Sequence, residues 1–390
     1  MSSGKMSGGH MVKTLIFKHL SATAQKHCPT SMNRIILPPL FATIMLLGSC
    51  ARAELDVPEI QTEVSYCVVS VKTPRGGSAA TASSETSEPA VQPAQTFTPR
   101  TKSAEYDKKQ SFGAWAWYLS AGKVWDKDKK EAIPYIGATS AEKISHSDGQ
   151  WKSTSHKYYW PKAGSLSFFA YSPYTLPENA GTVSCGKDGV SLTDYNIASQ
   201  CDFLVADPAT DKTAAETTYG LNGVPTLFRH ALSKVTVRAT LEKEFTDGKK
   251  VTITGITLGN LYLTASYKYS ATPQWTPQTT SLGSQTLAAS STDISTLAVV
   301  DVGSVFVIPQ SFGQRDGGVY PLITIKYTDE KNEDQTATRN LYVLSTKATS
   351  FEPGRHYIYT ISFGTSDQPI IFGGQSVEDW VVKGSDSIQY

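Results

Sequence analysis

Apolar and polar residues alternate in short runs along most of the chain after residue 100. In one such run Trp115 and Trp117 share a face, as they would in a β-strand, where successive side chains point to opposite sides. Further runs follow at intervals of about 10 to 15 residues, with Gly and Pro turn signals between them. Residues 101–222 contain no window with sustained apolar residues at helical spacing. The pattern predicts an all-β protein made of antiparallel β-sandwiches.

The alternation predicts one strand before residue 100 and a series of strands after it. They are 64–72, 112–118, 157–161, 165–173, 202–206, 227–240, 251–263, 304–309, 322–327, 341–344, 356–363, 370–372 and 377–382. Residues 126–131 alternate acids and lysines without the glycine of a calcium-binding loop, which predicts a solvated hairpin tip. His230 falls inside an alternating run and is expected to be a hydrogen-bonded sheet histidine.

Two stretches before residue 101 have a different composition. Residues 73–100 are dominated by Pro, Ser, Thr, Ala and Gly, which bury too little apolar surface to offset ordering entropy, so we predict a flexible linker. Residues 35–47 form an apolar run after Asn33 and Arg34. This run falls short of the roughly 20 residues that span a bilayer, and its basic start is typical of a secretory signal peptide.

The signal-like run ends in Leu47-Gly48-Ser49-Cys50, which resembles a bacterial lipobox. The resemblance implies that Cys50 is lipidated and becomes the first mature residue. The alternative is an ordinary signal peptide followed by an incidental cysteine. Because the signal begins naturally at Met32, we expect translation to start there.

Charge and cysteine content exclude several classes of function. The chain has 36 basic and 35 acidic residues, a net charge of +1, so no nucleic-acid partner is expected. No metal or cofactor motif and no catalytic constellation is found, and we predict a protein that is not an enzyme. Export permits disulfides, and Cys185 and Cys201 are candidates for one, or are two unpaired thiols.

Five of the seven tryptophans lie between residues 115 and 160. Trp115 and Trp117 could contact a glycan, since exposed aromatic faces stack on sugar rings. Strands also bury aromatic rings as core, each with a large apolar area, and we favour the core interpretation.

Several segments in this order resemble the fimbrillin family of Bacteroidia-type pilins, in its Mfa-like branch. They are the Cys50 lipobox, Arg100-Thr101, residues 158–161, 166–171, 202–206 and 228–237, Pro353-Gly354, and residues 357–363 and 377–380. The resemblance implies two transthyretin-like β-sandwich domains and a role as a fimbrial subunit or a tip or accessory protein in adhesion. Tip, stalk and anchor roles remain open.

The family also implies a route of assembly. The lipoprotein reaches the outer membrane, where it is held by lipid on Cys50 and exposed at the surface. A trypsin-like protease cuts after an arginine, and the freed groove accepts a strand from another fimbrial subunit. Here Arg100 and Arg75 are the candidate cut sites, and Arg100 matches the family position better. Residues 64–72 or 91–97 would be the removable strand, and residues 370–382 a candidate donor.

These observations predict four segments. Residues 1–49 are the leader and signal peptide, and residues 50–100 are the lipidated tether, removable strand and linker. Residues 101–222 and 223–390 are the N-terminal and C-terminal sandwiches. Adhesion would use a host or bacterial surface glycan or protein. The competing hypothesis is a permanently lipidated surface protein that binds glycan through Trp115 and Trp117.

Overall fold

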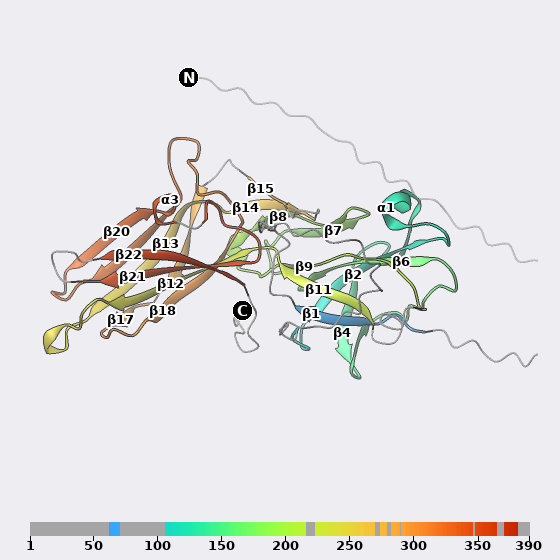
Figure 1. Cartoon of the computed structure of the whole chain (residues 1–390), viewed down its shortest axis with the longest axis horizontal. Helices are drawn as coiled ribbons and strands as arrows, with labels where there is room; N and C mark the ends of the chain where they lie inside the picture. The colour runs from blue at the N-terminus through green and yellow to red at the C-terminus, as the bar shows by residue number, and fades with distance from the viewer. Residues whose placement is uncertain are drawn as a thin grey trace, which may run out of the picture. The chain divides into compact units, whose positions relative to one another are not determined.

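The computed structural model describes residues 62–70, 106–215, 223–269, 274–278, 282–288, 290–345, 348–364 and 370–380. The predicted leader, Cys50, Arg75, Arg100 and residues 91–97 lie outside this part of the chain, so the predictions made for them stay predictions. The described part is built almost entirely of strands, which confirms the all-β fold class (Figure 1).

The largest sheet has nine strands in the order β10-β6-β9-β11-β1-β5-β4-β2-β3 within the described residues, and β6 also pairs with β2. That additional pairing closes the strands from β6 through β1 to β2 into a ring. Its strands are β1 (Tyr66–Ser70), β2 (Ser111–Leu119), β3 (Ile133–Ile136), β4 (Glu142–Ser147), β5 (Gln150–Ser153), β6 (Ser165–Ser172), β9 (Leu204–Ala206), β10 (Ala209–Lys212) and β11 (Val224–His230). All pairs in it are antiparallel except β1 with β11.

A second sheet has the order β15-β14-β8-β7. Its strands are β7 (Thr182–Gly186), β8 (Gly189–Asn196), β14 (Thr264–Lys268) and β15 (Gln274–Pro277). The pairing of β8 with β14 joins segments on either side of the predicted boundary at residues 222 and 223, as does that of β9 with β11. The boundary stays a prediction, but segments on both sides of it contribute to the same sheets.

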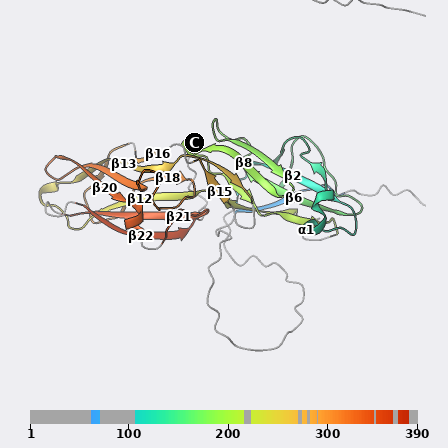
Figure 2. The ribbon, with the colours of Figure 1, turned by 90° about the horizontal axis from the view of Figure 1, so that it is seen from above.

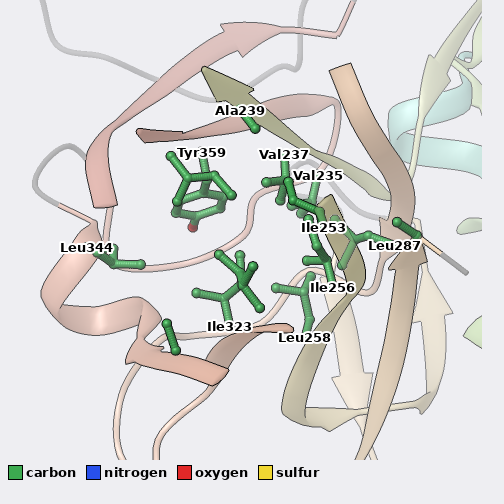
Figure 3. Close-up of a cluster of buried hydrophobic side chains, with 14 of the residues drawn as sticks. Val235, Val237, Ala239, Ile253, Ile256, Leu258, Leu287, Ile323, Leu344 and Tyr359 are labelled. Atoms are coloured by element: carbon green, nitrogen blue, oxygen red, sulfur yellow. The ribbon is translucent and has the colours of Figure 1, made fainter. Parts of the chain in front are cut away.

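The two remaining sheets have the orders β18-β12-β21-β22 and β16-β13-β19-β20, with β17 paired to β13. Their strands are β12 (Ser233–Leu241), β13 (Val251–Tyr262), β16 (Leu282–Ala288), β17 (Thr292–Ile294), β18 (Val300–Val307), β19 (Leu322–Thr328), β20 (Asp334–Asn340), β21 (Arg355–Phe363) and β22 (Ile371–Asp379). Their inward side chains form one buried cluster, in which Val237, Ile253, Ile323 and Tyr359 point toward one another (Figure 3). Strands β12 and β21 are parallel, which the sequence pattern did not predict.

The strands β2 and β6 are buried on both faces. They are paired over seven positions and lie side by side in Figure 2. One face, with Phe112 and Phe168, belongs to the core inside the ring. The other face, with Trp117 and Phe169, belongs to a second core shared with β8 and β14. This two-sided burial explains why both strands carry apolar residues at successive positions, at 114–117 in β2 and 168–171 in β6.

The described residues contain five helical turns: α1 (Trp125–Asp128), η1 (Lys129–Glu131), η2 (Ile197–Ser199), η3 (Thr246–Gly248) and α3 (Leu341–Leu344). One of them, α3, replaces a predicted strand. The predicted solvated hairpin tip at 126–131 is confirmed, because these residues lie, exposed or half-buried, in the connection between the antiparallel strands β2 and β3. The Trp125 side chain is buried and its backbone N–H donates to the Asp211 carboxylate (2.9 Å), while the Val124 N–H donates to Asp128 (2.9 Å), so the segment closes into a turn.

The predicted strand at 341–344 is wrong, because α3 forms there. Leu341 and Leu344 are buried, whereas Tyr342 and Val343 between them are exposed. A spacing of three places the two leucines on one face of a helical turn.

Several predicted strands have different limits in the structure. Residues 227–240 form two strands, because the chain leaves the ring after His230 and enters another sheet at Ser233. Residues 157–161 make only an isolated bridge, between Tyr159 and Glu63. The predicted strands at 370–372 and 377–382 overlap one continuous strand, β22 (Ile371–Asp379).

Candidate functional site

Strand β1 is the feature that matches a removable strand. It pairs in parallel with β11 over five positions, from Tyr66 opposite Val224 to Ser70 opposite Phe228. On its other side Tyr66 pairs with Trp151 of β5. Figure 1 shows β1, in blue, beside β11. Residues 66–70 of the predicted strand 64–72 thus lie inside a sheet whose other members all come from residues after 110.

Three further backbone contacts hold the beginning of this segment. The Val64 N–H donates to the Tyr158 carbonyl (2.8 Å), and the Trp160 N–H donates to the Thr62 carbonyl (3.0 Å). The Val224 N–H donates to the Ser65 carbonyl (2.7 Å). Residues 158–160 and β11 therefore form two walls of a groove that residues 62–70 fill.

The side chains of residues 64–68, at the start of β1 and just before it, alternate between this groove and the outside. Val64 and Tyr66 are buried, each 4% exposed, Val68 is half-buried, and Cys67 is exposed. The Tyr66 ring stands edge-on against Phe112 and Phe168, with centroid distances of 5.5 and 5.9 Å. Full burial of such a side chain contributes about 1.5–3 kcal/mol, so the inward side chains of β1 bind it to the groove.

Gly223 allows β11 to approach β1 closely. Its φ is +90°, and a Cβ placed on it would lie 2.6 Å from the Tyr66 carbonyl carbon. Only a glycine meets both conditions without strain.

Glu142 fixes the wall that contacts the beginning of β1. Its side chain is buried and accepts hydrogen bonds from Ser153 (2.6 Å), Ser155 and Tyr158 (3.1 Å). Burial raises the pKa of Glu142, but these three hydrogen bonds outweigh it and hold the pKa below its ordinary value. His156 Nδ1 lies 3.6 Å from the Glu142 carboxylate. The hydroxyls converge on the carboxylate, so the cluster orders residues 153–158.

The structure places the two candidate glycan contacts in the core. Trp115 and Trp117 are 6% and 7% exposed, and both rings belong to the core behind β2. The glycan-contact assignment is therefore wrong, because neither ring offers a face to a sugar. The core interpretation is confirmed.

The candidate disulfide between Cys185 and Cys201 is not formed. Both residues are free thiols: Cys201 is buried in the core behind β2, and Cys185 packs against the same core from β7. Burial raises the pKa of the Cys201 thiol to about 12 and raises that of Cys185 as well. Of the two alternatives, the structure contains the unpaired thiols.

His230 is a packed sheet histidine, as expected. Its Nδ1 lies 2.9 Å from the Asp202 carboxylate, and its ring stacks on Trp380 at 3.7 Å between centroids. Sequence reasoning identified β1 and His230 but missed Glu142 and Gly223. The Asn222-Gly223 pair before an alternating run is a turn signal, which could have marked Gly223.

Two further kinds of site are absent from the described residues. No group of three or more His, Cys, Asp or Glu side chains there could hold a metal ion. No helix in the same residues is long and apolar enough to cross a membrane.

Comparisons with known proteins point to one family. A family model described as fimbrillin-like matches residues 100–380, which begins after β1. No match was found among curated proteins.

Three solved structures resemble the chain. A fimbrial protein from Bacteroides vulgatus has a TM-score of 0.51 and 19% identity, over 69% of this chain and 93% of its own. A candidate cell adhesion protein from Bacteroides uniformis has a TM-score of 0.47 and 16% identity, over 71% and 93%. The C-terminally truncated tip fimbrial protein Mfa3 from Porphyromonas gingivalis has a TM-score of 0.33 and 12% identity, over 70% and 94%. Of the three, only the Bacteroides vulgatus protein is similar enough to support the shared fold.

Proposed function

The chain belongs to the fimbrillin-like family, and we propose that it is a fimbrial subunit or a fimbrium-associated tip or accessory protein that assembles by donor-strand addition. Membership of the family supports a fimbrial and adhesive role at the cell surface, in association with other fimbrial subunits. Assembly by donor-strand addition goes beyond what family membership supports and is proposed from the structure of the chain.

The position of β1 is the observation that supports donor-strand assembly. This strand lies between β11 and β5, and the inward side chains of Tyr66 and of Val64, two residues before it, fill a groove lined by later residues. If β1 left, β11 would lose a partner along five paired positions, and the ring core would be exposed. A strand from a second subunit would restore both the backbone pairing and the buried apolar surface.

We place delivery and release upstream of the described residues. In this proposal the chain is exported as a lipoprotein, and lipid on Cys50 holds it in the outer membrane. A trypsin-like protease then cuts after Arg100 or Arg75. Either cut separates β1 and Cys50 from the rest, so β1 would be held by non-covalent contacts alone.

The packing of β22 argues against it as the donor strand. It pairs with β21 at seven positions. Just beyond it the Trp380 N–H donates to the Gly354 carbonyl (2.9 Å), and the Trp380 ring stacks on His230. Withdrawal of residues 370–380 would break these contacts and open a second core, so we assign the donor strand to another segment or another subunit.

Limited trypsin digestion followed by intact mass and size-exclusion measurement tests the proposal. We expect a cut after Arg100 or Arg75, followed by oligomers whose size grows with protein concentration. Arg100→Ala and Arg75→Ala, singly and together, identify the site, and the double variant is the uncut control. A cut product that stays monomeric and retains residues 62–70 at every concentration would exclude donor-strand assembly.

Release from the membrane shows whether the lipid on Cys50 is a temporary attachment or a permanent anchor. Cells that express the wild type should release the processed protein from lipid, whereas the double arginine variant should stay in the membrane fraction. If the wild type also stays there with its amino-terminal segment attached, Cys50 is a permanent anchor. The competing glycan-binding hypothesis has lost its proposed site, because Trp115 and Trp117 are buried.

A further inference from the structure

Two polar atoms in the core around β1 have no hydrogen-bond partner within the described part of the chain. They are the hydroxyl of Tyr66 and the indole Nε1 of Trp160. The two side chains are 4% and 6% exposed, and both rings contact Phe168, at 5.9 and 5.7 Å between centroids. A buried hydroxyl without a partner carries the full free-energy cost of leaving water.

A second tyrosine in the same core shows that a hydroxyl can be satisfied there. Tyr106 is also buried, and its hydroxyl is hydrogen-bonded to the Ser172 hydroxyl. Tyr106 lies in the body of the protein, whereas Tyr66 lies on the strand proposed to leave. The unpaired hydroxyl therefore lies on the strand proposed to leave, whereas the unpaired Trp160 Nε1 belongs to the body of the protein.

The charge beside the Tyr66 pocket gives it a further preference. Burial raises the pKa of Tyr66 well above its usual range, and the nearby Glu142 carboxylate raises it further. Glu142 already accepts hydrogen bonds from Ser153, Ser155 and Tyr158. A carboxylate brought into the pocket would lose its hydration and meet the charge of Glu142.

We infer that the pocket filled by Tyr66 favours an apolar side chain without a hydroxyl or carboxylate, and that the strand replacing β1 carries one at the position opposite Val224. This inference rests on the proposed replacement of β1 and specifies its partner. The replacing strand has three inward side chains two residues apart, matching Val64, Tyr66 and Val68, and its central one is a Phe, Leu or Met. Tyr66 makes β1 an imperfect occupant of the groove, which favours exchange once the chain is cut.

Variants of the uncut, full chain test the pocket independently of any exchange. We expect Tyr66→Phe to raise the urea midpoint, because it removes the unpaired hydroxyl and keeps the ring. Tyr106→Phe is the matched control in the same core, and we expect it to lower the midpoint because it removes a formed hydrogen bond. If Tyr66→Phe lowers the midpoint as Tyr106→Phe does, the pocket stabilises the hydroxyl and the inference is wrong.

Peptides test the preference during exchange. The trypsin-cut full chain is mixed with a synthetic peptide of residues 62–70 labelled at Cys67, whose side chain faces outward. Unlabelled peptides with the native sequence, with Tyr66→Phe and with Tyr66→Glu then compete, and fluorescence anisotropy reports displacement. We expect Tyr66→Phe to compete at about tenfold lower concentration than the native peptide, the ratio that about 1.4 kcal/mol produces. We expect Tyr66→Glu to need at least about 100-fold more.

The two experiments separate the inference from the proposed function. If the native and Tyr66→Phe peptides compete equally, the groove exchanges strands but has no such preference, and the inference fails alone. If no peptide enters the groove while Tyr66→Phe stabilises the uncut chain, the pocket has its preference but β1 is not exchanged, and the proposed function fails.

Discussion

Gly223 offers the sharpest test of the contact between β1 and the groove. In Gly223→Ala the new methyl group meets two separate obstacles. The first is the backbone, since φ is +90° and L-residues lose about 1–2 kcal/mol in left-handed conformations. The second is β1 itself, because the Cβ would lie 2.6 Å from the Tyr66 carbonyl carbon and 2.8 Å from the Cys67 nitrogen.

The cost of the second obstacle follows from the geometry. Ordinary van der Waals contact begins at 3.4 Å, so β1 would have to move away by about 0.8 Å. The neighbouring hydrogen bond from the Val224 N–H to the Ser65 carbonyl, now 2.7 Å, would stretch to its limit. A lost hydrogen bond and local overpacking together destabilise by about 2 kcal/mol or more.

Gly122→Ala is the matched control. Gly122 has a φ of +83°, and nothing lies within 4 Å of its ideal Cβ, so the variant meets only the backbone obstacle. Urea unfolding should show a loss for Gly223→Ala that exceeds the loss for Gly122→Ala by about 2 kcal/mol. Hydrogen exchange at the Val64 and Val224 amides should accelerate only in Gly223→Ala. Equal losses in the two variants, with unchanged exchange at both amides, would refute the close packing of β11 against β1.

Three other predictions concern the folded body. Trp117→Ala should lower stability by about 3–5 kcal/mol in urea unfolding, because the ring is core, and a small loss would contradict that burial. Burial lowers the pKa of His356 to about 4, against 6.5 in the unfolded chain. Between these two pH values the unfolded state binds more protons than the folded state. The free energy of unfolding should therefore fall as the pH drops from 6.5 toward 4. His356→Gln should flatten this part of the curve of urea midpoint against pH, and an unchanged curve would exclude the assignment. In the native protein iodoacetamide should modify Cys67 but not Cys201, and a disulfide-linked peptide joining Cys185 and Cys201 in a non-reducing mass map would contradict the free thiols.

Much of the strand pattern could be predicted because alternation is a local property. Residues 64–72 and 251–263 were recognised as strands from their own side chains, and β1 and β13 lie within them. The prediction failed where a neighbouring sheet, and not the local pattern, sets the structure. Residues 227–240 keep an apolar rhythm throughout, but Ala231 and Leu232 are buried at the crossing from one sheet to another. The interruption depends on contacts with Phe203 and Gly354, which are distant in sequence.

The groove around β1 was beyond sequence reasoning for the same reason. Glu142 and Ser153 meet because β4 and β5 pair as a hairpin, and Tyr158 joins them only when the chain folds back. The spacing of these residues in the sequence does not predict that their hydroxyls donate to one carboxylate. The unpaired hydroxyl of Tyr66 is likewise a property of the packed core, since its sequence neighbours form an unremarkable strand.

The double role of β2 and β6 explains how a ring could lose one strand and keep its groove. Inside the ring their side chains contact the core that Val64 and Tyr66 complete. Outside it, Trp115, Trp117 and Phe169 belong to a core to which β1 contributes no side chain among the described residues. Loss of β1 would therefore open the ring between β11 and β5 while the seven-position pairing of β2 with β6 stays packed from behind. The wall carried by β11 is also held by β9 on its other edge. A groove with two supported walls would remain ordered enough to select an incoming strand by its side chains.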